Sequence, residues 1–197
     1  MPIELLPSFI RENYEIYEWK HATTILNGDF NSEWEDIIDT LTEFRLLNSW
    51  ISVGGGRKSN VAEWIDSKLI HERGWEEKSF DTKMVVDEIE NISPTHKIDC
   101  YKNRVALELE WNNKDPFFDR DLNNFRLLFD LRAISVGIII TRSDELQDIF
   151  DEIGRGASYG SSTTHIGKLL PRIQGGGGGG CPILVFGIKK SLYVRDK

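Results

Sequence analysis

Residues 104–111, with the sequence RVALELEW, alternate strictly between apolar side chains and others. The apolar positions are Val105, Leu107, Leu109 and Trp111. A period of two predicts a β-strand with one apolar and one polar face. The polar face carries two carboxylates, Glu108 and Glu110, with no basic residue beside them. This strand therefore brings two acidic groups close together, and the rest of the chain is searched for groups that account for them.

The composition is that of a globular protein. Of 197 residues, 40% are hydrophobic and 11% are aromatic, which gives enough apolar area to offset the entropy lost on folding. The length suits one core, and we expect a single domain over residues 1–197. No apolar run approaches the roughly 20 residues of a membrane span. The N-terminal segment MPIELLPSFIREN lacks a signal-peptide pattern, so we expect a cytoplasmic protein.

The charge limits the classes of partner. The formal net charge is -8 and the pI is near 5.1, which argues against non-specific polyanion binding as the main activity. A local basic cleft, or a metal ion held by carboxylates, still allows an acidic protein to bind phosphate. Cys100 and Cys181 lie in apolar segments, and we interpret both as core residues. No Cys/His spacing suggests zinc.

Helical and strand patterns mix along the chain. Helical spacing predicts helices over about 32–47, 60–73 and 118–132, with a short helix after Ser143. Apolar or alternating runs predict strands over 97–101, 104–111, 134–141 and 182–188. Ser32 with Glu35, and Asn60 with Glu63, have the spacing of helix caps. These elements predict an α/β fold, with a central mixed sheet of five to six strands flanked by helices.

The strands at 97–101 and 104–111 predict a hairpin. A two-residue turn at Lys102-Asn103 pairs Asp99 with Ala106 and sets the Asp99 side chain on the face of Glu108 and Glu110. A turn of odd length would send Asp99 to the other face unless a bulge corrected it. Three adjacent carboxylates raise one another's pKa, whereas Mg²⁺ prefers such oxygen ligands and can activate water against a phosphodiester. The pattern suggests a metal-dependent nuclease, and a merely solvated strand face stays open as the alternative.

Three polar segments are candidates for DNA contacts, and each is equally open to interpretation as a polar loop. SVGGGRKSN lacks the glycine directly before lysine that a nucleotide P-loop needs, but it could touch a phosphate backbone. NNKDPFFDR follows the acidic strand and offers groups for base edges, and SSTTHIGK with Arg172 offers groups for phosphate. The candidate residues are Arg57, Lys58, Ser59, Asn60, Asn112, Asn113, Lys114, Thr163, Thr164, His165, Lys168 and Arg172. The run Gly175–Gly180 allows close backbone approach or is a flexible loop.

The stretch KIDCYKNRVALELEWNNKDPFFDRDLNNFRLLF, followed by GIIITR, resembles the type II restriction endonucleases of the BamHI, BglII and BstYI group in the PD-(D/E)xK superfamily. The family pattern is an Asp, a variable gap, then Glu-apolar-X, here Asp99, Glu108 and Glu110. Most of the superfamily has Lys at X, BamHI-like members have Glu, and BglII-like members have Gln. HATTILNGDFNSEWEDIIDTL, NVAEWIDSKLIHERGW and CPILVFGI extend the likeness over most of the chain.

The resemblance implies a restriction-endonuclease-like fold and a Mg²⁺-dependent site, with Mn²⁺ as a substitute. Asp99 and Glu108 would hold the metal, the Leu109 carbonyl would be a further ligand, and Glu110 would orient or deprotonate the attacking water. The group also has a metal-proximal residue after its second helix. Glu77 is the nearest acidic match here, with Lys78 competing for the position.

The resemblance also implies the partners. A prokaryotic homodimer would cut both strands of a short palindrome in double-stranded DNA and leave 5′-phosphates, beside a cognate DNA methyltransferase. The exposed side of the helix at about 118–132 is a candidate dimer surface. Two other functions remain open. One is a structure-specific repair or mobile-element nuclease, and the other is a DNA-binding module without catalysis.

Overall fold

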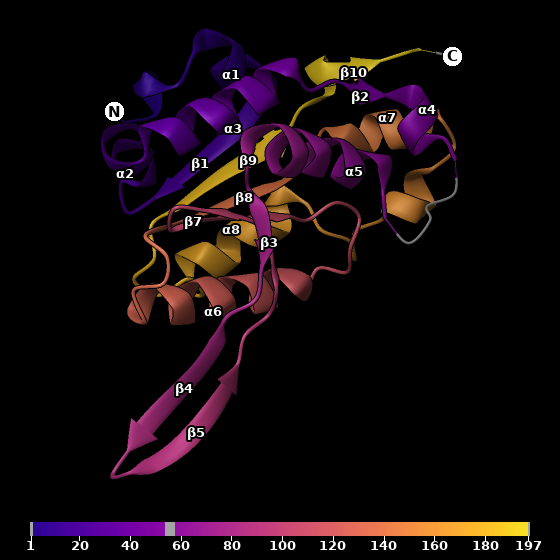
Figure 1. Ribbon diagram of the computed structural model, residues 1–197. Helices are drawn as coiled ribbons and strands as arrows, with labels where there is room; N and C mark the ends of the chain where they lie inside the picture. The colour runs from indigo at the N-terminus through magenta and orange to yellow at the C-terminus, as the bar shows by residue number, and fades with distance from the viewer. Residues whose placement is uncertain (1, 54–57, 197) are drawn as a thin grey trace.

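A six-stranded mixed sheet forms the centre of the computed structural model, which describes residues 2–53 and 58–196 (Figure 1). Its order is β1-β9-β8-β7-β6-β3. The strands are β1 (Tyr14–Trp19), β3 (Glu76–Lys78), β6 (Ile98–Lys102), β7 (Val105–Leu109), β8 (Val136–Arg142) and β9 (Ile183–Ile188). The central strands β7, β8 and β9 are parallel, and the outer strands pair antiparallel. The predicted α/β fold with a mixed sheet is confirmed.

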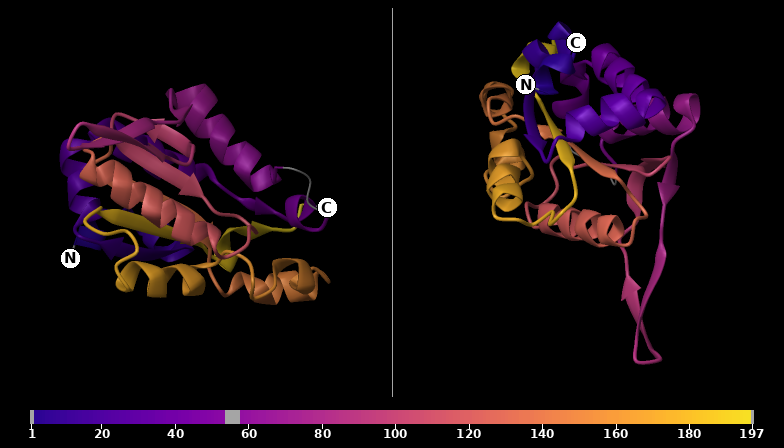
Figure 2. Two further views of the ribbon diagram at one scale, coloured as in Figure 1. Left: turned by 90° about the horizontal axis from the view of Figure 1, so that it is seen from below. Right: turned by 90° about the vertical axis from the view of Figure 1, so that its left-hand side faces the viewer.

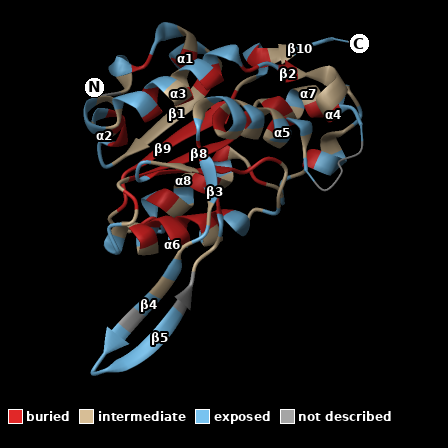
Figure 3. Ribbon diagram, viewed as in Figure 1, coloured by how far each residue is buried: buried red, intermediate tan, exposed pale blue. Residues whose placement is uncertain are grey.

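Helices cover both faces of this sheet (Figures 1 and 2). One face packs against α1 (Ser8–Asn13), α2 (Ala22–Asp29), α3 (Asn31–Glu43), α4 (Asn48–Ile51), α5 (Asn60–Asp66), its π-helical continuation η2 (Ser67–Glu72) and α7 (Leu146–Glu152). The other face packs against α6 (Phe117–Asp130) and α8 (Ile166–Gln174). Every residue of β7, β8 and β9 is therefore buried, as expected for parallel strands inside two helical layers (Figure 3).

Short elements complete the fold. They are η1 (Pro2–Leu5), η3 (Gly156–Tyr159), η4 (Lys190–Leu192) and the two-stranded parallel pair of β2 (Leu46–Leu47) with β10 (Tyr193–Val194). Across the described residues, no helix combines the length and the apolar character that crossing a membrane requires.

Close packing fixes the position of α6 on the sheet. A Cβ added at Gly137 of β8 would overlap the ring of Phe125 in α6. The missing side chain lets the helix approach the strand, so the face of α6 that carries Phe118, Leu122 and Phe125 is buried. This approach also sets the first turn of α6 beside the end of β7, where the acidic residues lie.

Two predicted helix starts differ from those observed. The capping box of Ser32 with Glu35 does not form, because α3 begins after Phe30, without a side-chain cap. The second cap is Ser59, not Asn60, since the Ser59 hydroxyl accepts a hydrogen bond from the Ala62 N–H at 3.1 Å. Ser59 has the extended backbone that an N-cap needs. The first predicted helix also ends at Glu43 instead of about 47.

Residues 81–94 form a ribbon to which the sequence analysis assigned no element. Strand β4 (Asp81–Val86) pairs antiparallel with β5 (Ile89–Pro94), and within the described chain these two strands make a sheet of their own. The ribbon extends away from the rest of the molecule in each view that shows its length (Figures 1 and 2). We call it the arm.

Candidate active site

The hairpin that carries the predicted catalytic residues turns one position later than expected. Lys102 pairs with Val105, so the turn is Asn103-Arg104, and the predicted Lys102-Asn103 turn is wrong. Asn103 and Arg104 have φ values of 44° and 68°, which suits the two-residue turns of hairpins. Lys102 stays in the strand because its ammonium group donates to Asp36 Oδ2 at 2.7 Å and to the Arg73 carbonyl at 3.0 Å.

A bulge in β6 then redirects Asp99. Strand β3 pairs with β6 at Glu76–Tyr101 and Lys78–Ile98, so three steps along β6 match two along β3. Its effect is visible in the core, where Cys100 packs on the α3 and α5 side while Ile98 packs on the α6 side. The Asp99 carboxylate accepts a hydrogen bond from the Leu109 N–H at 3.0 Å. The predicted pairing of Asp99 with Ala106 is wrong, and the bulge brings Asp99 to the end of β7.

Glu108 meets Asp99 at this point. Its Oε2 lies 3.3 Å from the Asp99 N–H, and its side chain is fully buried. The other oxygen, Oε1, is also buried and has no hydrogen-bond partner among the described residues. Burial first, and then the nearby carboxylates of Asp121 and Asp99, raise the Glu108 pKa well above its ordinary value. Burial also raises the pKa of Asp99, to about 6.

Glu110 is held by donors on both of its oxygens. The Asn113 amide donates to Oε2 at 2.8 Å, and the Arg120 guanidinium donates to Oε1 at 3.2 Å. Its main-chain carbonyl accepts from the Thr141 and Thr164 hydroxyls at 2.9 and 3.2 Å. Burial, followed by the Asp121 carboxylate, raises the Glu110 pKa to about 9. The side chain is thus fixed in position while its charged form is disfavoured.

Asp121, in the first half of α6, is a fourth carboxylate that sequence reasoning missed. Its side chain is fully buried, Arg120 donates to Oδ1 at 2.9 Å, and Oδ2 has no partner among the described residues. Burial raises its pKa. A signal was present in the sequence, because Asp121 is three residues after Phe118 and four before Phe125, on the apolar stripe of the helix. An acidic residue on such a stripe is expected to be buried, and buried acids are rare unless they are paired or bind a ligand.

A cavity of about 780 Å³ opens beside these residues. It brings together predicted residues from four separate stretches of the chain, and adds others that were not predicted. The predicted residues are Lys58, Ser59, Asn60, Glu77, Asp99, Leu109, Asn112 and Asn113. The others include Trp50, Glu63, Asp66, Trp111, Arg155 and Tyr159. Glu108 and Glu110 are buried behind this wall and do not line it.

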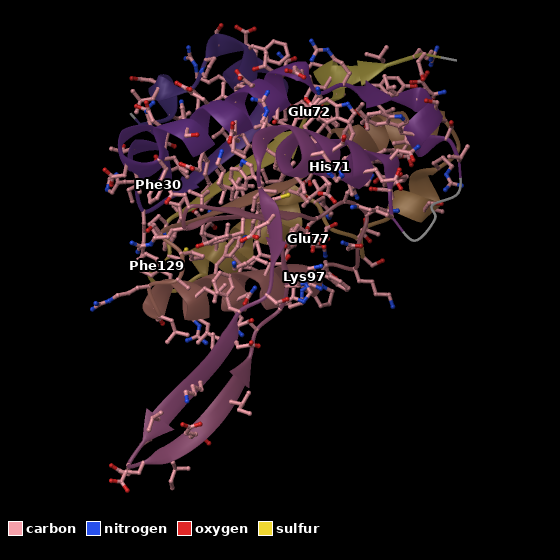
Figure 4. The ribbon with its side chains drawn as sticks, viewed as in Figure 1. Phe30, His71, Glu72, Glu77, Lys97 and Phe129 are labelled. Carbon is pink, nitrogen blue, oxygen red and sulfur yellow. The ribbon has the colours of Figure 1, made fainter. Side chains whose placement is uncertain are left out.

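Two ion pairs involve carboxylates of the cavity wall. Lys58 pairs with Asp66 of α5, and the negative charges of Asp66, Glu77 and Asp99 all raise its pKa. Glu77 in β3 pairs with Lys97, and Figure 4 shows the two side chains next to each other. Asp66 carried no sequence signal of its own, since only the fold brings its helix to the hairpin.

The predicted contacts around α8 lie elsewhere. Thr164 is fully buried and its hydroxyl supports the Glu110 carbonyl, which leaves it no surface for DNA. Thr163 accepts from Arg142, His165 contacts Asp144, and both are away from the cavity. Arg172 is tied to Asp119 and Asp115 at 2.9 and 3.1 Å. Lys168 also lies in α8, and its main-chain carbonyl accepts a hydrogen bond from the Arg172 guanidinium at 2.7 Å.

Two further candidates complete this comparison. Lys114 is exposed and forms an isolated antiparallel bridge with Thr163. Arg57 lies outside the described residues.

The donor chemistry fits a hard divalent cation. Glu108 Oε2 accepts from the Asp99 N–H, the Asp99 carboxylate accepts from the Leu109 N–H, and the other Glu108 oxygen is buried without a partner among the described residues. Carboxylate and carbonyl oxygens are the ligands that Mg²⁺ prefers, and a cation would favour the charged forms that burial penalises. Within the described residues, no three His, Cys, Asp or Glu side chains are already arranged as a cage. Binding would therefore require side chains to reorient.

Comparison with known proteins supports the geometry. No curated protein matches the chain significantly. The family model described as restriction endonuclease BglII/BglIII matches residues 14–188, which run from the first residue of β1 to the last residue of β9. The match includes the whole sheet, the hairpin and α6, and covers most of the chain. The protein belongs to the BglII/BglIII family of restriction endonucleases, which are DNA-hydrolysing enzymes.

Proposed function

We propose that this protein is a Mg²⁺-dependent type II restriction endonuclease. As a homodimer it hydrolyses both strands of a short palindromic site in double-stranded DNA and leaves 5′-phosphates. The observation that carries the proposal is the contact of Glu108 with the Asp99 N–H and of Asp99 with the Leu109 N–H, beside a cavity open to solvent. A cognate DNA methyltransferase would protect the host DNA.

Asp99, Glu108 and the Leu109 carbonyl would hold the metal, which Mn²⁺ could replace. Bound there, a divalent cation polarises a phosphodiester and lowers the pKa of water. Glu77 lines the same cavity from β3 and would join as a ligand only after leaving Lys97. The orphaned Glu108 oxygen supports this assignment, because a buried carboxylate oxygen without a donor is costly unless a ligand completes it.

Glu110 orients the attacking water in this proposal. Asn113 and Arg120 hold its carboxylate, so the orientation is set before substrate arrives. Burial raises its pKa to about 9 without metal, and a bound cation would lower this pKa and favour the ionised form that accepts a proton from water. The family position that Glu110 occupies is often Lys, so the positive charge near the phosphate must come from elsewhere. Lys58 and Arg155 both line the cavity, and Lys58, whose pKa is raised by its hydrogen bond to Asp66, is our candidate for that role.

DNA would reach the cavity through residues that line its wall. Lys58 and Asn60 come from the start of α5, and Asn112 and Asn113 follow β7. Lysine can neutralise a backbone phosphate, and asparagine can read adenine in the major groove. Arg57, the residue before Lys58 in the sequence, stays a proposed phosphate contact.

Plasmid cleavage with the conservative variant Glu108→Gln tests the proposal. Wild type with Mg²⁺ should give discrete, reproducible fragments of long duplex DNA. Glu108→Gln should lose more than about 100-fold in cleavage rate with Mg²⁺, because one ligand charge is gone, while its gel-shift affinity for the site in EDTA stays within about three-fold of wild type. The matched control is Glu35→Gln, an exposed glutamate on α3, which should cut normally. Normal cutting by Glu108→Gln would refute the metal assignment, and no cutting by wild type would favour a non-catalytic DNA-binding module.

A further inference from the structure

The arm exposes apolar side chains on both of its faces. In the β4–β5 register, Val86 faces with Ile89, while Val85 and Ile92 lie on the opposite face. Ile92 is 85% exposed and Ile89 is 65% exposed. Of the nine large apolar side chains that are exposed in the described chain, four belong to the arm, which is a short segment. Such a concentration marks an interaction surface.

The arm is also poorly stabilised by itself. A two-stranded ribbon is marginal in water without a further strand or a helix to pack against. Its turn residues, Asp87 and Glu88, have φ values of 48° and 67°, in a region where Asn and Gly are preferred. One ion pair, between Lys83 and Glu90 at 2.9 Å, crosses the strands, and both of its side chains are exposed. Covering the arm with a partner would therefore stabilise it.

The charge of the arm argues against a DNA backbone as that partner. Residues 81–94 contain four carboxylates and one lysine, for a net charge of -3. Such a surface repels phosphate and favours a partner that is both apolar and basic. The tip is the most acidic part, since Asp87, Glu88 and Glu90 lie within four residues of one another.

The same chain carries a surface of that kind where α6 ends. Arg104, Arg126 and Arg132 are exposed, and none forms an ion pair with another described residue. Leu131, between them, is 42% exposed. Hydrogen bonds join the segments, because the Arg104 carbonyl accepts from Ser135 at 2.7 Å and the Phe129 carbonyl accepts from Arg132 at 2.9 Å. We call these four residues the α6-end patch. Phe129 marks this end of the helix in Figure 4, and Asp130 is the exposed acid beside it.

We propose that the acidic, apolar arm of one protomer docks on the α6-end patch of a second copy of this chain. The arm tip then faces the three arginines, and one of the two apolar faces of the arm covers Leu131. In a two-fold dimer each protomer offers one arm and one patch, so the contact forms twice. The proposal rests on the dimer that the proposed function requires, and it identifies the surfaces. Neither the arm nor the patch is among the residues that line the cavity.

Sedimentation equilibrium tests the apolar half of the contact. The double variant Ile89→Ser with Ile92→Ser should raise the dimer dissociation constant by about ten-fold or more. The matched control is Leu5→Ser, which removes a half-exposed apolar side chain at the other end of the chain and should leave the constant unchanged. An unchanged constant in the arm variant overturns the proposal. If that variant instead weakens DNA binding at an unchanged dimer constant, the arm is a DNA-binding element.

A charge swap tests the pairing of the two surfaces. Asp87→Lys with Glu88→Lys should weaken the dimer, as should Arg126→Glu with Arg132→Asp, where Asp tolerates the positive φ of 59°. All four changes in one chain should restore the wild-type constant to within about three-fold, because opposite charges face each other again. Failure of this rescue overturns the arm-to-patch contact.

The two proposals fail in different ways. Each protomer has its own Asp99 and Glu108, so a monomeric arm variant should still nick supercoiled plasmid with Mg²⁺ while losing linearisation. Absence of any cleavage by wild type would refute the nuclease proposal, and the sedimentation results would still decide the arm contact.

Discussion

Glu110→Gln should flatten the pH dependence of stability in the metal-free protein. The Glu110 pKa is near 9 in the folded state and near its ordinary value of 4.5 in the unfolded chain. Between these values the folded state binds one more proton than the unfolded state, so stability is lost as pH rises. The slope is about 1.4 kcal/mol per pH unit. From pH 7.0 to 8.5 the free energy of unfolding should fall by about 2 kcal/mol on account of Glu110.

Urea denaturation in the presence of EDTA at these two pH values measures the effect. The window lies above the Asp99 pKa of about 6, so Asp99 contributes little to it. Glu110→Gln should reduce the fall of the unfolding free energy with pH by about 1.4 kcal/mol per pH unit, the contribution of one bound proton. The exposed control Glu35→Gln should leave this slope unchanged. Added Mg²⁺ should also reduce the slope, because a bound cation favours the ionised carboxylates. A wild-type stability that is flat or rises over this window would refute the reasoning, as would an unchanged slope in Glu110→Gln.

Three further substitutions probe the supports of the site. Gly137→Ala should destabilise the protein by about 1–3 kcal/mol in thermal or urea unfolding, since the new methyl group overlaps the Phe125 ring of α6. The control Gly28→Ala should be neutral or slightly stabilising, because nothing lies within 4 Å of the added Cβ. Arg120→Met should slow single-turnover cleavage more than Arg120→Lys does, because it frees two carboxylates together. Thr164→Val should cost about 1 kcal/mol and lower the cleavage rate with little change in gel-shift affinity, since its hydroxyl supports a carbonyl and not DNA.

Alternation in the sequence was enough to locate the acidic strand. The period-two pattern at 105–111 predicted β7, which ends at Leu109, and the mixture of helical and strand patterns predicted the sheet that the structure confirms. The turn was misplaced by one residue because Asn103-Arg104 and Lys102-Asn103 are both plausible turns in sequence. Lys102 remains in the strand through contacts with Asp36 and the Arg73 carbonyl, which lie far away along the chain.

The bulge at Asp99 could not have been located from local sequence. It arises from the pairing of β3 with β6, and the residues 81–94 of the arm separate those strands. Asp66 was invisible for the same reason, since only tertiary packing brings α5 to the cavity. Asp121, in contrast, was readable as an acid on an apolar helical stripe. Buried polar residues at odds with the local pattern are therefore the sequence signal most worth following in such chains.

The buried acids explain how an acidic protein can bind an acidic polymer. Three acids of the site are buried: Glu108, Glu110 and Asp121. Among the described residues, the one guanidinium that pairs with any of them is that of Arg120, which contacts Glu110 and Asp121. Burial raises the pKa of all three groups, which favours their uncharged forms in the metal-free state. A divalent cation would replace protons there with a fixed positive charge, which attracts phosphate to the cavity. The buried acids would then lower the stability of the metal-free protein and make its affinity for DNA depend on metal. Gel-shift binding should therefore strengthen with Mg²⁺ in wild type and much less in Glu108→Gln.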